Sequence, residues 1–268
     1  MIALEKVSFS YGAAPVLRDI SLHIEKGEFV AVTGPNGTGK STLVKLMDGL
    51  LKPTAGRVLV DGMDTRRVRT SLLAREVGFL FQNPDRQLCQ STVREEILFG
   101  LKLIYKDKAE IERRLNDTLQ AFSLDPARNP LTASRGEKQR IVLASLLALT
   151  PKLLLLDEPT TGLDYRECME IMTRIQSLNQ AGTTVVMISH DMELVQQFSS
   201  RVLVVADGTL LADGTPHQVL RKAQVLQDAS LLPPQILQLA QALGDEFADT
   251  DTYEEMAARI AQRKAELQ

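Results

Sequence analysis

Short apolar runs alternate with helical stretches along most of the chain, and this alternation predicts a largely parallel α/β sheet. The runs that are rich in aliphatic and β-branched residues span 29–33, 77–81, 152–157 and 183–189. The run at 152–157 has no polar alternation, which is typical of a central strand covered on both faces. We therefore expect a layered α/β core whose strands are separated by helices, the first of them at about 41–50.

Two other apolar patterns predict antiparallel strands. Residues 201–206 and 209–212 flank Asp207-Gly208, a pair that favours a hairpin on a tight turn. The N-terminal pieces, about residues 2–30 and 57–61, alternate in a way that indicates an antiparallel β layer.

The apolar period changes to a helical one between about residues 90 and 149. Ile111, Leu115, Leu119 and Phe122 fall at helical spacing and form one apolar stripe. This pattern predicts a helical subdomain inserted in the α/β core. The chain is also predicted to be helical from about residue 216, with an interruption at Pro233-Pro234.

Composition narrows the function classes more than it narrows the fold. The net charge of −3 over 268 residues gives no broad basic face for nucleic acid or anionic lipid. Residues 221–268 hold five basic and eight acidic residues, so this tail carries the whole net charge. Cys89 and Cys168 lie far apart without metal-ligand spacing, and we expect free thiols.

The chain contains no apolar run of about 20 residues that could cross a bilayer as a helix. Its first residues also lack a basic stretch followed by an apolar one, which would indicate a secretory signal. We therefore expect a cytosolic protein whose role at the membrane, if it has one, depends on a partner.

A Gly-rich turn after the run at 29–33 matches the phosphate-binding P-loop pattern G-x-x-x-x-G-K-[ST]. Its amide groups can point into one concavity and hold phosphate oxygens, while the lysine neutralises phosphate charge and the first hydroxyl offers a ligand to Mg²⁺. A mere flexible turn is the alternative, but the strand before and the helix after favour the P-loop. The positions predicted to bind nucleotide are Gly34, Asn36, Gly37, Thr38, Gly39, Lys40, Ser41 and Thr42.

A second candidate lies at the end of the apolar run 152–157, where Asp157 is followed by Glu158. The carboxyl end of a central strand is where α/β sheets bind ligands, so both acids are expected beside the P-loop. Asp157 is predicted to hold Mg²⁺ through water, and Glu158 to polarise the attacking water. Solvated acids at a strand end are the alternative interpretation.

These two motifs resemble those of the ABC ATPase family, and the resemblance covers about residues 2–220. It implies a P-loop NTPase core that binds ATP and Mg²⁺ and hydrolyses ATP. By resemblance, Tyr11 stacks on adenine, Gln82 is the Q-loop glutamine that reaches the metal, and His190 is the switch histidine that contacts the γ-phosphate. Thr161–Asp164 corresponds to the D-loop at the dimer interface, and Asp164 is its predicted contact.

The family's signature segment, usually Leu-Ser-Gly-Gly-Gln, corresponds here to Ala133–Glu137. In the family this segment binds the γ-phosphate of the nucleotide held by the opposite subunit, which implies that Ser134, Arg135, Gly136 and Glu137 act on a partner's ATP. Ser134 and Glu137 also fit a helix capping box, and both roles are compatible. The sequence departs from the family pattern at three of the five positions. Arg135 either contacts the partner's triphosphate or is a solvated residue paired with Glu137.

Two stretches resemble one branch of the family, the ATPases of energy-coupling-factor importers and their cobalt and nickel relatives. These stretches are FQNPDRQL at 81–88 and LPPQILQLA at 232–240. The resemblance implies an ATPase at the cytoplasmic face of the membrane that pairs with a like or unlike ATPase subunit. It also implies a transmembrane coupling protein, a membrane protein that captures a vitamin or metal ion, and no nucleic acid.

The domain organisation expected from these motifs is an ATPase domain at 1–220, with the helical subdomain at about 90–149, and a helical extension at 221–268. The extension is a candidate dimerisation element. Two other function classes stay open. One is an ABC ATPase that acts on a ribosome or DNA complex. The other is a nucleotide-binding protein without turnover, which the altered signature segment supports but the intact Lys40, Asp157, Glu158 and His190 disfavour.

Overall fold

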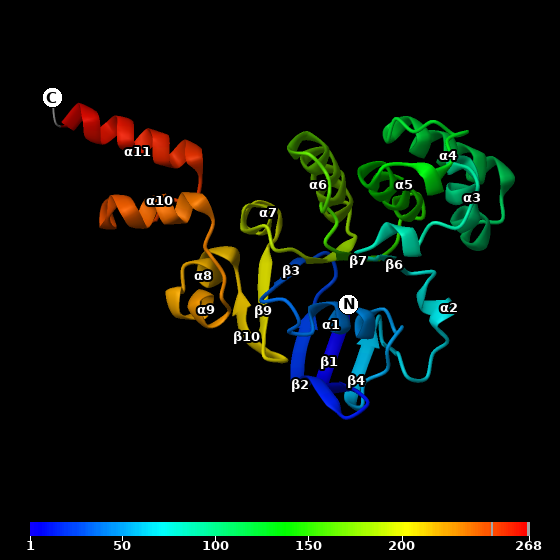
Figure 1. Cartoon of the computed structure of the whole chain (residues 1–268), viewed down its shortest axis with the longest axis horizontal. Coiled ribbons are helices and arrows are strands. Elements are labelled where there is room, and N and C mark those ends of the chain that lie inside the picture. Colours follow the sequence, from blue (N-terminus) through cyan, green and yellow to red (C-terminus); the bar gives the residue numbers. More distant parts are fainter. Residues whose placement is uncertain (248, 267–268) are drawn as a thin grey trace.

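The computed structural model describes residues 1–247 and 249–266 as two β-sheets surrounded by helices. One sheet has four antiparallel strands in the order β2-β1-β4-β5. It is the predicted N-terminal β layer, and it forms the lower part of Figure 1. Its strands are β1 (Ile2–Tyr11), β2 (Ala14–Ile24), β4 (Ala55–Val60) and β5 (Met63–Asp64).

The central sheet has six strands in the order β10-β9-β3-β8-β7-β6. All neighbours pair in parallel except β10, which is antiparallel to β9. The strands β3, β7 and β8 are fully buried along their whole length, which the sequence predicted for β7 from its run without polar alternation. The bounds are β3 (Phe29–Thr33), β6 (Val77–Leu80), β7 (Leu153–Asp157), β8 (Thr184–Ile188), β9 (Arg201–Ala206) and β10 (Thr209–Gly214).

The expected strands are all present, and only their ends differ. For example, β10 continues two residues beyond the prediction, because Asp213 and Gly214 still pair with Leu203 and Val202 of β9. The first helix is α1 (Lys40–Met47), which begins one residue earlier and ends three residues earlier than expected.

A cluster of helices lies at one end of the central sheet, beyond β6 and β7, in the green part of Figure 1. It contains α3 (Val93–Ile104), α4 (Lys108–Ala121) and α5 (Arg135–Leu147). The predicted stripe of α4 faces inward, since Ile111 and Leu115 are buried and Leu119 and Phe122 pack against the same core. The helical stretch predicted at about 90–149 therefore forms one layer, and its apolar cluster continues into β6, β7 and β8 of the central sheet.

The C-terminal helices lie at the opposite end, beyond β9 and β10 (Figure 1). They share a third apolar cluster with the central sheet, in which Leu226, Ile236 and Leu237 pack with Met192 and Val195 of α7. No helix among the described residues is both long and apolar enough to cross a membrane. The helices not yet given bounds are α2 (Thr70–Leu73), α6 (Tyr165–Gln180), α7 (Met192–Phe198), α8 (Pro216–Leu220), α9 (Ala223–Asp228), α10 (Gln235–Leu243) and α11 (Tyr253–Glu266).

Candidate active site

The carboxyl ends of the central strands meet at one edge of the sheet. Val32 of β3 pairs with Ile188 of β8, and Ile188 pairs in turn with Asp157 of β7. Leu80 of β6 pairs with Leu156, so the segment that carries Gln82 leaves the sheet at the same edge. This register brings four segments that are distant in the sequence to one place, which is where open α/β sheets bind ligands.

The P-loop (Gly34–Thr42) connects β3 to α1, and two of its glycines are required by geometry. Gly34 has φ 141°, and a Cβ there would lie 2.0 Å from the carbonyl oxygen of Val205 on β9. Gly39 has φ 98°, and a Cβ there would lie 2.7 Å from Cδ2 of Leu17. Only glycine fits both positions, because they combine left-handed backbone with close approach of neighbouring atoms. The loop is thereby pressed against β9 and β2.

Lys40 is buried in the P-loop, with 6% of its surface exposed. Its Nζ donates hydrogen bonds to the carbonyl oxygens of Gly34 at 2.7 Å and Pro35 at 2.6 Å. Burial lowers the pKa of this lysine, and the nearby carboxylates of Glu158 and Asp157 oppose that shift. A desolvated cation is thus held at the phosphate-binding loop, where it interacts more strongly with an anion than a solvated one would.

Asp157 is the last residue of β7 and is 4% exposed. Burial raises the pKa of its carboxyl group, while a hydrogen bond from the Ser41 side chain opposes the shift. The structure therefore places together two of the three predicted metal ligands, a hydroxyl and a carboxylate. Oxygen donors of this kind are the ones that Mg²⁺ prefers, so the residues fit the expected ion.

Glu158 lies at the centre of a polar network that joins three other segments. Its Oε2 accepts hydrogen bonds from Gln82 Nε2 at 3.1 Å and Thr161 Oγ1 at 3.2 Å, and its Oε1 lies 3.1 Å from His190 Nε2. The backbone of Glu158 has φ 55°, a left-handed conformation that is uncommon for a residue with a side chain. Its N–H donates to the carbonyl oxygen of Ile188, which fixes this turn against β8.

The signature segment (Ala133–Glu137) begins α5 with the expected capping box. Ser134 Oγ accepts from the Glu137 N–H at 3.3 Å, and Glu137 Oε2 accepts from the Ser134 N–H at 2.8 Å. These bonds, and Arg128 at 3.6 Å, lower the pKa of Glu137. Ser134 and Arg135 are exposed, whereas Gly136 and Glu137 are half-buried.

Arg135 lies against the D-loop (Thr161–Asp164) of its own chain and not against Glu137. A Cβ added to Gly162 would lie 3.3 Å from Arg135 Cδ. Within the described part of the chain Arg135 forms no ion pair, so the alternative in which it pairs with Glu137 is not what the structure shows. Its guanidinium group remains available at the molecular surface.

The other two predicted nucleotide contacts lie outside this network. Asp164 caps α6, because its Oδ1 accepts from the Glu167 N–H at 2.8 Å. Tyr11, at the end of β1, is 52% exposed and stacks edge-on with Phe9 at 4.8 Å between ring centroids. No hydrogen bond among the described residues joins Tyr11, Asp164 or the signature segment to the P-loop.

Several residues that support the site were not singled out from the sequence. Thr161 donates to Glu158 from three residues along the same turn, a spacing that could have indicated it. Gln139 is buried and donates to the carbonyl oxygen of Pro159, which fastens α5 beside the end of β7. Gln87 bonds to both Phe79 and Phe81 and so holds the start of the Q-loop. Glutamines on predicted helices and loops carry no pattern that distinguishes these from solvated ones.

Comparison with known sequences identifies relatives over almost the whole chain. The sequence model of the ABC transporter family (ABC_tran) matches residues 17–161. The energy-coupling factor transporter ATP-binding protein EcfA of Methanothermobacter thermautotrophicus is 41% identical over 248 residues, which cover 91% of this chain and 80% of that protein. A putative ABC transporter ATP-binding protein of Enterococcus faecalis is also 41% identical over 248 residues. The chain spans only 44% of the length of this second relative.

Two solved structures share the fold. CbiO1 from Clostridium perfringens, described as part of the ABC transporter complex cbiONQ, has a TM-score of 0.74 at 31% identity, covering 90% of this chain and 98% of that one. The ATP-binding cassette MJ0796, in a dimeric post-hydrolysis state bound to ADP and Pi, has a TM-score of 0.74 at 29% identity, covering 81% and 99%. Together with the P-loop and the residues gathered around Glu158, these findings show that the chain belongs to the ATP-binding proteins of the ABC transporter family, the ABC ATPases.

Proposed function

We propose that the chain hydrolyses ATP as one of two ATPase subunits that close around two ATP molecules and drive import of a small solute through separate membrane proteins. The observation that carries this proposal is the convergence of Gln82 and His190 on Glu158, beside Asp157 and the P-loop. A water-polarising carboxylate needs partners that orient it, and its neighbours here are those expected around a γ-phosphate. The dimeric MJ0796 cassette supports pairing of two subunits.

Each predicted nucleotide- or metal-binding residue has a distinct role in this proposal. Lys40 and the amides of the P-loop bind the phosphates, and Tyr11 stacks on adenine. Ser41, Asp157 and Gln82 hold Mg²⁺, which neutralises phosphate charge when it is bound. The protein therefore works mainly by positioning and charge stabilisation, with little covalent chemistry of its own.

Glu158 and His190 act on the reaction itself. Glu158 orients the attacking water, and His190 contacts the γ-phosphate from the end of β8. The 3.1 Å contact between the two side chains keeps both at the phosphate side of the sheet. The left-handed backbone at Glu158 supports this role, because strained conformations of this kind cluster at functional sites.

The signature segment acts on the nucleotide of the opposite subunit. Ser134, Arg135, Gly136 and Glu137 present the N-terminus of α5, which favours an anion through its free N–H groups and dipole. Arg135 adds a guanidinium group that can contact the partner's phosphate. The D-loop, with Asp164 at the start of α6, lies alongside it at the same interface.

The transport role follows from the branch of the family. The FQNPDRQL and LPPQILQLA stretches and the similarity to EcfA and cbiO1 support an ATPase of the energy-coupling-factor type. We infer a transmembrane coupling protein and a substrate-capture protein for a vitamin or a transition-metal ion as partners. The chain then lies at the cytoplasmic face of the membrane.

The C-terminal extension (221–268) is proposed to help pair the two ATPase subunits. Leu239 and Leu243 are spaced one helical turn apart on α10 and are 41% and 43% exposed, and Ile260 on α11 is 45% exposed. Truncation near residue 220 would also uncover the apolar cluster around Met192 and Val195. Substitution of Leu239 and Leu243 by glutamine is therefore the cleaner test, and it should weaken pairing while ATP affinity stays unchanged.

The catalytic part of the proposal is tested by Glu158→Gln. We expect ATP binding to persist, turnover to fall by about 10²-fold or more, and an ATP-bound dimer to accumulate in size-exclusion chromatography. Glu112→Gln is the matched control, because Glu112 is an exposed carboxylate on α4 whose partner is Arg94. Near-normal phosphate release by Glu158→Gln would contradict the assignment.

The partner part is tested by affinity purification of the tagged chain from solubilised membranes, with identification of every co-eluting protein. Recovery of a transmembrane protein and a second ATPase subunit is the expected result. Recovery with ribosomes or DNA instead would support the non-transport class of ABC ATPase and contradict the import proposal.

A further inference from the structure

The junction between α5 and β7 connects two functional segments at their far ends. The helix α5 starts at the signature segment and ends at Leu147, and β7 starts at Leu153 and ends at Asp157. Only a short connection, residues 148–152, lies between them. The angle at this connection therefore determines how the signature segment is presented relative to the catalytic carboxylates of the same chain.

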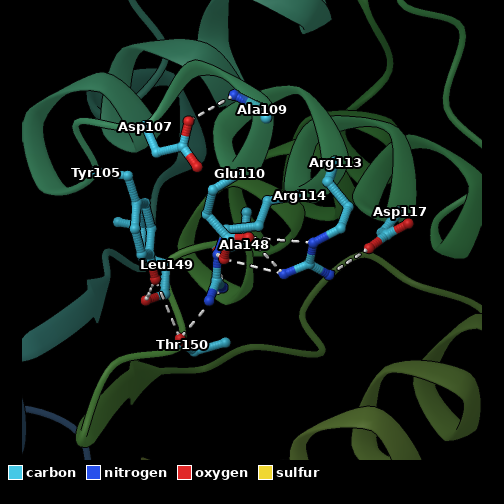
Figure 2. Close-up of polar contacts among 10 residues, drawn as sticks. All are labelled: Tyr105, Asp107, Ala109, Glu110, Arg113, Arg114, Asp117, Ala148, Leu149 and Thr150. Atoms are coloured by element: carbon cyan, nitrogen blue, oxygen red, sulfur yellow. Dashed lines mark hydrogen bonds and ion pairs between the residues drawn. The ribbon is translucent and has the colours of Figure 1, made fainter.

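Two side chains bind this junction, as Figure 2 shows: Tyr105, directly after α3, and Arg114 on α4. The hydroxyl of Tyr105 donates to the carbonyl oxygen of Leu149 at 3.0 Å and lies 3.3 Å from Thr150 Oγ1. Arg114 donates from one guanidinium nitrogen to the carbonyl oxygen of Ala148 at 3.2 Å and to Thr150 Oγ1 at 3.4 Å. Three consecutive residues of the junction are thus held from one side.

The Arg114 side chain is itself fixed by two neighbours. Its guanidinium carbon lies 4.3 Å from the centre of the Tyr105 ring, a cation–π arrangement. Its Nε donates to Glu110 Oε1 at 2.6 Å, one helical turn earlier on α4. A planar guanidinium held in this way loses little further freedom when it binds two acceptors. The contact to the junction is therefore preorganised.

The junction needs such support for two reasons. The last carbonyl groups of a helix have no partner within it, and Ala148 and Leu149 supply two of these groups after α5. Thr150 has φ 47°, which is a strained conformation for a β-branched residue. On the other side of the junction, the Pro151 carbonyl oxygen accepts from Thr183 Oγ1 at 3.2 Å, which fastens it to the α/β core.

A small rotation at the junction has a large effect at the signature segment. An α-helix of 13 residues is about 20 Å long. A change of about 10° at its C-terminal end would therefore move Ser134 by roughly 3 Å. Hydrogen bonds to a phosphate tolerate only a few tenths of an ångström, so this displacement would break them.

We propose that Arg114 and Tyr105 are positioning residues that fix the angle between α5 and β7, and thereby place the signature segment against the partner subunit's ATP. This inference rests on the proposed function, in which the signature segment completes the opposite site. It assigns to Arg114 and Tyr105 a role in ATP hydrolysis, although neither side chain belongs to the proposed nucleotide site. Gln139 and Lys138 fasten the first half of α5, and Arg114 and Tyr105 fasten its end.

Three variants separate positioning from general stability. Tyr105→Phe keeps the ring beneath Arg114 but removes both junction contacts of the hydroxyl. Arg114→Lys keeps the charge beside Glu110 but loses the planar fork that reaches Ala148 and Thr150. Arg113→Lys is the matched control. Arg113 lies on the same helix and also pairs with Glu110, but its other partner is the exposed Asp117 and not the junction.

We expect Arg114→Lys to lower kcat for ATP hydrolysis by about 10-fold and Tyr105→Phe by about 3-fold, with KM for ATP within about twofold of the wild type. In the Glu158→Gln background, both changes should reduce the ATP-bound dimer at a fixed ATP concentration. Arg113→Lys should change neither kcat nor the amount of ATP-bound dimer. The assays are run at a temperature at which circular dichroism shows all variants to be folded.

Wild-type kcat and dimer yield in Arg114→Lys and Tyr105→Phe would overturn the inference, as would an equal loss in Arg113→Lys. A loss seen only as a rise in KM would also overturn it, because the junction does not contact the P-loop. Failure of the proposed function would give a different result, since the wild type would then show no ATP turnover that depends on Glu158.

Discussion

The P-loop half and the signature half of this cassette differ in how completely one chain satisfies them. In the P-loop half, Lys40 and Asp157 are almost fully buried, and Glu158 has partners from three segments. In the signature half, Ser134 and Arg135 are exposed, and the polar contacts of the segment are the capping bonds between Ser134 and Glu137 and the ion pair of Glu137 with Arg128. The key side chains of the P-loop half are buried or bonded to other segments, whereas those of the signature half are exposed.

This difference fits the proposal that the site is shared between two subunits. Buried charges strengthen electrostatic interactions and require no reorganisation during the reaction, which suits the half that holds the nucleotide. An exposed helix N-terminus suits the half that is proposed to bind the partner subunit and to separate from it again. Four experiments test this contrast, in order of decreasing expected effect.

The largest effect is expected from Lys40→Ala. Loss of the buried cation should lower ATP turnover by about 10³-fold or more and abolish tight ATP binding, because the phosphate charge loses a desolvated partner. Lys26→Ala is the control, since that lysine is exposed and pairs with Asp61. Equilibrium binding of a fluorescent ATP analogue, with a phosphate-release assay, measures both. If Lys40→Ala bound ATP as tightly as Lys26→Ala, the buried cation would not distinguish the P-loop half from the signature half.

A pH-dependent effect on stability is expected from the carboxyl group of Asp48, at the C-terminal end of α1. Burial raises the pKa of Asp48 to about 7, and Lys52 opposes the shift only in part. The folded protein therefore binds more protons than the unfolded chain between about pH 4 and 7, and the free energy of unfolding falls as pH rises through this range. Above about pH 7 the Asp48 carboxyl group is ionised in the folded protein too, and the loss of stability is then complete.

Asp48→Asn should remove this loss of stability. We expect the free energy of unfolding to rise by about 2–4 kcal/mol at pH 8 and to change little at pH 4, since one pKa unit corresponds to about 1.4 kcal/mol. Urea unfolding of both proteins at several pH values gives the comparison. If the wild type and the variant show the same slope with pH, Asp48 is not the group responsible.

A mixing experiment tests whether the signature half acts in trans. In a dimer of Arg135→Ala with Lys40→Ala, the surviving P-loop faces an intact signature segment and activity should remain. When both changes are in one chain and the partner is wild type, the surviving P-loop faces the altered segment, and hydrolysis should be about 10-fold lower. Differently tagged chains purified in tandem provide the two dimers. Equal rates in both would leave Arg135 without a role at the phosphate.

The smallest effect is expected from the cap of α5. Ser134→Ala should lower the free energy of unfolding by about 1 kcal/mol, because the Glu137 N–H loses its acceptor, whereas Ser134→Thr keeps one. Urea unfolding at neutral pH distinguishes them. Ser134→Ala should also lower turnover, and a variant that lost stability but hydrolysed ATP normally would confine Ser134 to its structural role.

The two halves also differ in what could be predicted about their contacts. The capping box of Ser134 and Glu137 lies within four consecutive residues, and the sequence indicated it directly. The bond between Gln82 and Glu158 joins residues 76 positions apart, and it was not predicted, because the family resemblance assigned Gln82 only to the metal. The support of α5 by Gln139, Arg114 and Tyr105 was not predicted, because isolated polar residues on amphipathic helices look like solvated ones.

The sequence by itself determined the strands, the P-loop, the capping box of α5 and the order of the motifs, because turns, caps and burial periodicity depend on neighbours along the chain. Only the tertiary structure decided the strand order β3-β8-β7-β6, which gathers Gln82, Glu158 and His190 at one edge of the sheet. It also decided that Arg135 lies on the D-loop and that Arg114 holds the end of α5. These contacts depend on packing between segments that are distant in the sequence. Local sequence patterns do not show which distant side chain a residue will contact.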